Sequence, residues 1–239
     1  MTSPASRDVG VGVIVPHDMR LDRELWRWAP PDVALFFTRT PHTPLAVTVE
    51  MVARISKGDD VAQCTKDLMA TESEVYAYAC TSGSFLRGPS GERDLVAAMQ
   101  AAGAPHALTT SGAFLRAIEV LGVSRVSVAL PYLEDLSVRL EAFLSASGVE
   151  VVASAHLGMV SDIAKVPYET TVDLVRRADH PDAQAVLVSC TNLSTYDLIA
   201  GLEEELGKPV VSANQATMWA ALKVIDRVGV GPRQRLLAL

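Results

Sequence analysis

The regular alternation of short apolar runs with longer amphipathic stretches constrains the fold of this 239-residue chain more than any other feature. Each apolar run suits a buried strand, and a stretch with helical periodicity follows most of them. Strands separated by helices in this way form parallel sheets with right-handed crossovers. The expected strands are residues 9–15, 33–37, 74–79, 106–110, 125–130, 150–155, 185–189 and 209–212.

Local start and stop signals mark the helices between these strands. Pro167 stands at the first turn of one helix, a position that proline tolerates well. Gly122 and Gly148 follow two others, where glycine commonly ends a helix. Ser111 is expected to cap the helix after the fourth strand. The expected helices are residues 43–56, 59–69, 92–102, 111–121, 133–147, 167–178, 195–206 and 214–228.

The second half of the chain repeats the pattern of the first half. VIVP at 13–16 resembles VALP at 128–131, and YACTS at 78–82 resembles VSCTN at 188–192. Two matches in the same order predict an internal duplication. We therefore expect an α/β fold with two lobes related by a pseudo-twofold axis, each a four-stranded, mainly parallel sheet flanked by helices, with the active site in the cleft between them. The expected lobes are residues 1–113 plus 213–239, and 114–212.

Composition limits the classes of function. Hydrophobic residues make up 49% of the chain and charged residues 21%, which suits a well-packed globular core. The net charge of −7 argues against nucleic-acid binding. No apolar run reaches the roughly 18 residues of a membrane span, and the N-terminal segment lacks the apolar stretch of a secretory leader. A cytoplasmic location is expected, with free thiols at the three cysteines.

Two of the three cysteines directly follow equivalent strands. Cys80 ends the run at 74–79 and Cys190 ends the run at 185–189. Ligands of open α/β sheets bind beyond the carboxyl ends of the strands, so the duplication places one thiol on each side of a shared cleft. A free cysteine is often only a small buried hydrophobe, and we assign that structural role to Cys64, which lies in a helical stretch.

Small polar residues follow both of these cysteines. Thr81 and Ser82 come after the first, and Thr191 and Asn192 after the second. Loops of this composition offer N–H and hydroxyl donors that bind a carboxylate and stabilise a thiolate. One thiolate can then remove a proton or attack carbon while the opposing thiol donates a proton. This chemistry needs no metal and no organic cofactor.

Three further residues follow strand ends. The Tyr132 hydroxyl can donate to a substrate carboxylate, or the side chain is an ordinary half-buried tyrosine. His17 and His156 can act as bases or carboxylate partners, or they lie at the surface. The remaining histidines, His42, His106 and His180, show no metal-ligand spacing. The chain lacks dinucleotide-binding, phosphate-loop and nucleophile-elbow motifs.

Taken together, these motifs resemble the aspartate/glutamate racemase superfamily, and most of all its branch with maleate cis-trans isomerase and arylmalonate decarboxylase. The resemblance implies two α/β lobes and cofactor-free chemistry beside a carboxylate. A homodimer is the common expectation for this family. The segments that resemble the family are GVIVP at 12–16, YACTSGSF at 78–85, ALPYLEDL at 129–136, VLVSCTNL at 186–193 and GKPVVSANQATMWA at 207–220.

The resemblance also implies roles for single residues. In maleate isomerases the first cysteine attacks the double bond, and the second transfers the proton. By position, these two cysteines correspond to Cys80 and Cys190. In racemases the pair works as base and acid on opposite faces. Arylmalonate decarboxylases keep only the second cysteine and have glycine at the first position, so the presence of both weighs against that activity. The implied substrate-binding residues are Pro16, His17, Met19, Thr81, Ser82, Tyr132, Thr191 and Asn192.

One position departs from the family pattern. Met19 stands where maleate isomerases have an asparagine that helps to hold the substrate. The run at 157–163 also lacks an expected asparagine, although Ser161 or Asp162 can substitute. The second carboxylate of maleate therefore has fewer obvious partners, unless His17 and Arg20 take over its recognition.

Three hypotheses follow for the function. The first is a cofactor-independent isomerase or racemase of a small carboxylic acid, in which Cys80 and Cys190 act from opposite faces. The second is a decarboxylase of a disubstituted malonate with Cys190 as proton donor. The third is a non-catalytic carboxylate-binding protein, whose thiols iodoacetamide would label slowly near neutral pH because such a protein needs no reactive thiolate.

Overall fold

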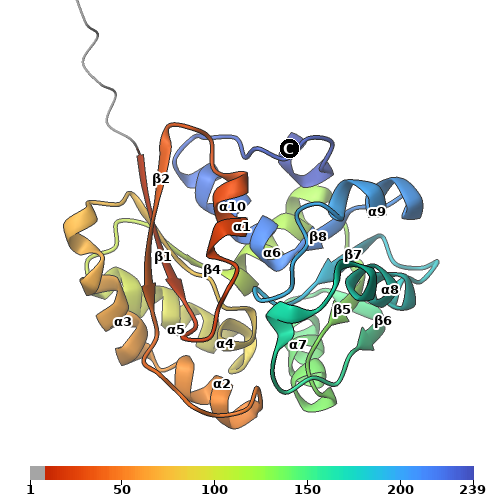
Figure 1. Ribbon diagram of the computed structural model, residues 1–239, viewed down its shortest axis with the longest axis horizontal. Coiled ribbons are helices and arrows are strands. Elements are labelled where there is room, and N and C mark those ends of the chain that lie inside the picture. The colour runs from red at the N-terminus through yellow and green to blue at the C-terminus, as the bar shows by residue number, and fades with distance from the viewer. Residues whose placement is uncertain (1–8) are drawn as a thin grey trace, which may run out of the picture.

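The strands form two separate sheets in the computed structural model, which describes residues 9–239 (Figure 1). Residues 1–8, which make up most of the N-terminal segment without the apolar stretch of a secretory leader, lie outside this range. The first sheet has the order β2-β1-β3-β4 and the second the order β6-β5-β7-β8, and all pairings are parallel. The strands are β1 (Val9–Val15), β2 (Val33–Arg39), β3 (Val75–Tyr78), β4 (Ala107–Thr109), β5 (Arg125–Leu130), β6 (Glu150–His156), β7 (Ala185–Val188) and β8 (Val210–Ser212).

The two sheets have the same strand order, which confirms the predicted α/β fold with two similar lobes. We call the β1–β4 sheet with its helices the first lobe, and the β5–β8 sheet with its helices the second lobe. The central strands β3 and β7 are buried along their whole length. Helices cover both faces of such strands, so their sequences are continuous apolar runs.

Helices connect the strands in both lobes. No helix of the described residues is long and apolar enough to cross a bilayer. The helices are α1 (Asp22–Trp28), α2 (Val49–Ile55), α3 (Gly58–Asp67), α4 (Thr81–Phe85), α5 (Gly88–Ala101), α6 (Thr110–Leu121), α7 (Glu134–Ala146), α8 (Tyr168–Ala178), α9 (Ile199–Leu206) and α10 (Ala213–Val224), with short 3₁₀ turns at Met69–Thr71, Ile163–Lys165 and Arg235–Ala238.

Helix α10 is the most deeply buried helix and joins the two lobes. Its residues from Ala213 to Leu222 are all buried. It packs against α6 and α1 and also contacts β3, β4 and β8, and in Figure 1 it lies with α6 between the two sheets. A helix buried on nearly all sides belongs to the core, and its buried polar side chains need partners there.

Several helices begin elsewhere than the pattern predicts. The helix expected over 43–56 starts only at Val49, because Thr48 before it has an extended backbone and Pro44 disfavours helical backbone at Thr43. The helix expected from 195 starts at Ile199, and the short helix α4 after Cys80 is not predicted at all. Thr109, not Ser111, caps α6, since its hydroxyl accepts a hydrogen bond from the N–H of Gly112.

The loop before α2 reaches across to the second lobe. The N–H of Val47 donates to the carbonyl of Val160, with 2.7 Å between nitrogen and oxygen. This backbone bond joins the segment before α2 to the segment after β6. Both segments lie beside the carboxyl ends of the strands, where a ligand is expected.

Candidate active site

Cys80 and Cys190 line a single buried pocket at the carboxyl ends of β3 and β7. The two thiols come from equivalent strands of the two lobes, as the duplication predicts. Eight of the ten residues that the sequence singles out line this pocket. They are Pro16, Cys80, Thr81, Ser82, Tyr132, Cys190, Thr191 and Asn192.

The pocket is small. It leaves about 30 Å³ for the centres of water-sized molecules, which is room for roughly one or two waters. A more open groove runs along α7 and β6, but no cysteine, histidine or aromatic side chain lines it, so we place the candidate site in the smaller pocket.

The Cys80 sulfur caps the N-terminus of α4. The N–H of Gly83 donates to it across 3.3 Å, and the Ser82 hydroxyl lies 3.9 Å away. Burial raises the pKa of the Cys80 thiol to about 11, although the Gly83 N–H and the hydroxyls of Tyr78 and Ser82 act to lower it. The donors are thus in place for a thiolate, but desolvation outweighs them.

Cys190 lies in a strained part of the backbone. Its φ of 129° falls in a region that residues with side chains rarely adopt. The N–H of Asn192 donates to its sulfur across 3.4 Å. Burial raises the pKa of this thiol to about 12, while hydrogen bonds from Tyr132 and Asn192 act to lower it. Strained backbone at a reactive side chain is typical of functional sites.

The high pKa values of the two thiols change how the iodoacetamide test is interpreted. The loops do supply donors to both sulfurs, but burial keeps both thiols protonated at neutral pH. Slow labelling by iodoacetamide near neutral pH therefore no longer separates an enzyme from a carboxylate-binding protein.

Thr81 offers a free hydroxyl inside the pocket. Its Oγ1 is buried and has no hydrogen-bond partner among the described residues. A buried hydroxyl without a partner is costly unless a ligand satisfies it. Tyr132 is also buried in the pocket, close enough for its hydroxyl to affect the Cys190 thiol. These two side chains can hold a carboxylate between the thiols.

The side-chain amide of Asn192 holds two loops together. Its Oδ1 accepts from the backbone N–H of Arg20, and its Nδ2 donates to the carbonyl of Asp18, at 2.9 Å and 3.1 Å. The amide therefore ties the loop after Cys190 to the loop after β1. Only its backbone N–H, which points at Cys190, is directed at a reactive group.

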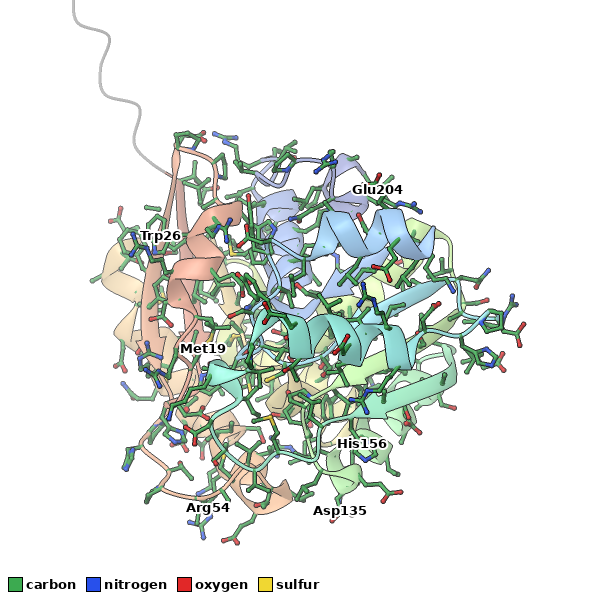
Figure 2. The ribbon with its side chains drawn as sticks, turned by 45° about the vertical axis from the view of Figure 1, so that its right-hand side comes forward. Met19, Trp26, Arg54, Asp135, His156 and Glu204 are labelled. Atoms are coloured by element: carbon green, nitrogen blue, oxygen red, sulfur yellow. The ribbon has the colours of Figure 1, made fainter. Side chains whose placement is uncertain are left out.

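Two predicted site residues lie outside the pocket. The His17 N–H donates to the Thr40 hydroxyl, and the ring of His17 contacts that of His42 edge-on with 5.4 Å between centroids. Met19 is buried in the core of the first lobe. Figure 2 shows Met19 far from His156, which is exposed at the end of β6 and also does not line the pocket. Met19 therefore does not line the pocket that holds the two thiols.

The structure adds five lining residues that the sequence analysis did not single out for the site. Met51 and Ile55 lie one turn apart on α2, a spacing that places both side chains on one face of the helix. Val47 from the loop before α2 and Ile163 from the second lobe complete an apolar wall. The fifth residue is Asp18, whose charge adds to the effect of burial in raising the pKa of both thiols. Only the Met51–Ile55 spacing is a signal that the sequence offers.

The described residues hold no group of three or more His, Cys, Asp or Glu side chains arranged for a metal ion.

Comparisons with known proteins extend this picture. Residues 48–235 match the model of the arylmalonate decarboxylase family. The arylmalonate decarboxylase of Bordetella bronchiseptica is 35% identical over 170 residues, covering 70% of this chain and 71% of that protein. The maleate isomerase of Geobacillus stearothermophilus is 25% identical over 204 residues, covering 82% and 80%.

Solved structures of this group share the fold. A liganded arylmalonate decarboxylase, in which one glycine is replaced by cysteine and one cysteine by serine, superposes with a TM-score of 0.87 at 31% identity. The match covers 95% of this chain and 98% of that chain.

Proposed function

The chain belongs to the arylmalonate decarboxylase family, whose characterised relatives are enzymes, and on that premise we propose that it is a cofactor-independent isomerase or racemase of a small carboxylic acid. The observation that carries the proposal is the pair of thiols, Cys80 and Cys190, which line one pocket from opposite lobes. A planar carbon held between them is open to attack on one face and to proton transfer on the other.

For an unsaturated diacid, the proposed reaction begins with addition. The Cys80 thiolate forms a C–S bond to one alkene carbon, and the Cys190 thiol protonates the other. Rotation about the new single bond follows. The Cys190 thiolate then removes that proton and the C–S bond breaks, which restores the alkene in the opposite geometry and both groups in their starting forms.

For a saturated acid, the same pair exchanges the α-proton. One thiolate removes it, and the negative charge moves onto the carboxylate as an enediolate. The opposing thiol protonates the other face. The Thr81 and Tyr132 side chains line the pocket, which supports a role for their hydroxyls as donors that stabilise this charge. Preorganised donors of this kind are usually the largest single contribution to catalysis.

Asp18 favours the racemase form of this proposal. It lines the pocket near both thiols, and no Lys, Arg or His lines the pocket within residues 9–239. A fixed carboxylate attracts the ammonium group of an amino acid and repels a second substrate carboxylate. We therefore expect Asp18→Asn to weaken the turnover of an amino acid relative to that of a diacid.

Proton NMR of the protein with small acids in D₂O tests the proposal. The panel is maleate, both enantiomers of aspartate and of glutamate, and phenylmalonate. Maleate converting to fumarate identifies an isomerase, and deuterium entering the α-position of an amino acid identifies a racemase. The Cys80→Ala, Cys190→Ala double variant is the control. Turnover that survives in this variant contradicts a thiol-based reaction.

The apolar wall supports a second candidate, a decarboxylase of a substituted malonate. A carboxylate pressed against Val47, Met51 and Ile163 is poorly solvated, and this disfavours the dianion relative to a product that has lost CO₂. Cys190 would then protonate the resulting enediolate. In that case Cys80→Gly keeps the release of CO₂ from phenylmalonate, whereas the two-thiol reaction stops in the same variant.

The high thiol pKa values predict a steep pH dependence. Both pKa values are raised by burial, so the thiolate fraction at neutral pH is small and grows as the pH rises. We expect kcat/KM to increase by up to about tenfold per pH unit between roughly pH 6 and 9. Initial rates over this range, with the circular dichroism of each sample as a check on folding, measure the slope. A flat profile would show that no thiol must ionise.

A further inference from the structure

Glu24 of α1 is a buried carboxylate that holds the loop after Cys190 from the other lobe. It is 7% exposed. One carboxylate oxygen accepts from the N–H groups of Thr195 and Tyr196, at 2.6 Å and 2.7 Å. The second oxygen accepts from Nδ2 of Asn214, at 2.6 Å. Glu24 does not line the pocket, and none of these contacts involves substrate-binding side chains.

Asn214 extends this contact toward the thiol. The same Nδ2 that donates to Glu24 also donates to the carbonyl oxygen of Thr191, at 3.0 Å. In a trans peptide the carbonyl and the following N–H point in opposite directions. With the Thr191 carbonyl turned toward Asn214, the N–H of Asn192 faces the other way, and it donates to the Cys190 sulfur.

These contacts form one continuous chain from the first lobe to the second thiol. We propose that Glu24 and Asn214 are positioning residues that fix the peptide between Thr191 and Asn192, so that its N–H stays directed at the Cys190 sulfur. The strained backbone of Cys190, with its φ of 129°, explains why such an anchor is needed. A strained segment keeps its geometry only when surrounding contacts hold it.

The charge of Glu24 is what selects the orientation of the Asn214 amide. All three partners of this carboxylate are N–H donors, and an ionised carboxylate only accepts. Asn214 must therefore turn its NH₂ group, not its oxygen, toward Glu24, and the second hydrogen of that group reaches Thr191. Burial raises the pKa of Glu24, while the three N–H donors and the charge of Arg27 act in the opposite direction.

Replacing Glu24 with glutamine removes the charge that orients the Asn214 amide, with little change in side-chain shape. The NH₂ group of the glutamine must face either the NH₂ group of Asn214 or the backbone N–H groups of Thr195 and Tyr196. In both orientations two hydrogen-bond donors face each other. If Asn214 turns to relieve the clash, its oxygen faces the Thr191 carbonyl. The peptide then loses its anchor, and the Cys190 sulfur loses the N–H that stabilises its thiolate.

Labelling of the two pocket cysteines with iodoacetamide at about pH 8, followed by peptide mass spectrometry, tests the proposal. Because both thiols line the same pocket, a change in the access of iodoacetamide to the pocket affects both and leaves the ratio of Cys190 to Cys80 labelling unchanged. We expect Glu24→Gln to lower this ratio about fivefold, the effect of one lost hydrogen bond. Asn214→Ala should lower it to a similar extent and provides the test if the first variant does not fold.

Glu203 supplies the matched control. It is also a buried glutamate, and its carboxylate accepts from the backbone N–H groups of Val210 and Arg235, away from the pocket. Glu203→Gln should leave the labelling ratio unchanged. An unchanged ratio in Glu24→Gln and Asn214→Ala overturns the proposal, as does an equal fall in Glu203→Gln.

The proposal rests on the proposed role of Cys190, but the labelling needs no substrate. Failure of the proposed function would appear as absent turnover with the labelling shift intact. The other titratable groups that act on the Cys190 thiol are Tyr132, Asp18 and Cys80, and all three are unchanged in every variant.

Discussion

Replacing Cys80 or Cys190 with alanine should abolish isomerisation or racemisation while leaving the fold intact. Each thiol performs a step that the other cannot perform from its own face of the substrate. We expect kcat to fall by about 10³-fold or more in each single variant, as for other covalent and acid–base residues. The double variant should be scarcely worse than either single variant, because residues that act as a unit are not additive.

Cys64→Ala is the matched control for these variants. Cys64 is also a buried free thiol, but it lies on α3 outside the pocket, and its sulfur contacts the carbonyl of Arg39. Its loss should cost about 1 kcal/mol of folding stability and none of the turnover. Thermal unfolding followed by circular dichroism checks that all three variants are folded. Activity close to wild type in Cys80→Ala rules out the two-thiol reaction.

Replacing Gly83 with alanine, which adds a single methyl group, should cause the second large loss of activity. A Cβ at this position would overlap the Tyr78 hydroxyl oxygen and lie 3.0 Å from the Cys80 sulfur. Tyr78 cannot easily move aside, because it is fully buried and its hydroxyl donates to the carbonyl of Ile55 at 2.8 Å. Residue 83 and its backbone must therefore move away from Tyr78, and the hydrogen bond from its N–H to the Cys80 sulfur is strained or lost.

We expect Gly83→Ala to lower kcat by about 10²-fold, since a displacement near 1 Å at a reacting atom typically costs that much. The overlap should also cost about 1–3 kcal/mol of folding stability. Steady-state kinetics and thermal unfolding measure the two effects separately.

Gly201→Ala is the matched control for the change at Gly83. Gly201 lies on α9, and a Cβ there meets no other atom within 4 Å. This variant should keep full activity and be as stable as the wild type or up to about 1 kcal/mol more stable. If Gly83→Ala behaves like Gly201→Ala, the tight contact at Cys80 has no part in the reaction.

Much of the fold followed from local patterns in the sequence. The apolar runs gave every strand to within two residues at each end, and Gly122 ends α6 in the left-handed conformation that glycine favours. The exceptions were helix termini: α2 and α9 start later than expected, and α10 ends at Val224 rather than at residue 228. Proline and capping geometry act within a few residues, and periodicity alone does not locate these ends.

The pocket residues of the two cysteine loops also followed from the sequence. A residue at the carboxyl end of a central parallel strand must lie at the ligand-binding edge of its sheet. Cys80, Thr81 and Ser82 in one lobe, and Cys190 and Thr191 in the other, could therefore be placed without coordinates.

Contacts between distant segments were decided only by the tertiary structure. The apolar wall joins Val47 and Ile163, which no local pattern connects, and Met19 lies in the core although its neighbour Asp18 lines the pocket. The use of the Asn192 amide as a tie between loops, and the chain from Glu24 through Asn214 to Cys190, likewise depend on how the lobes pack.

The sequence by itself determined which residues end the strands, because strand period and apolar runs are properties of neighbours along the chain. It did not determine how acidic the two thiols are. Their pKa depends on the balance between burial and a few N–H and O–H donors, and that balance exists only once both lobes have closed around the pocket.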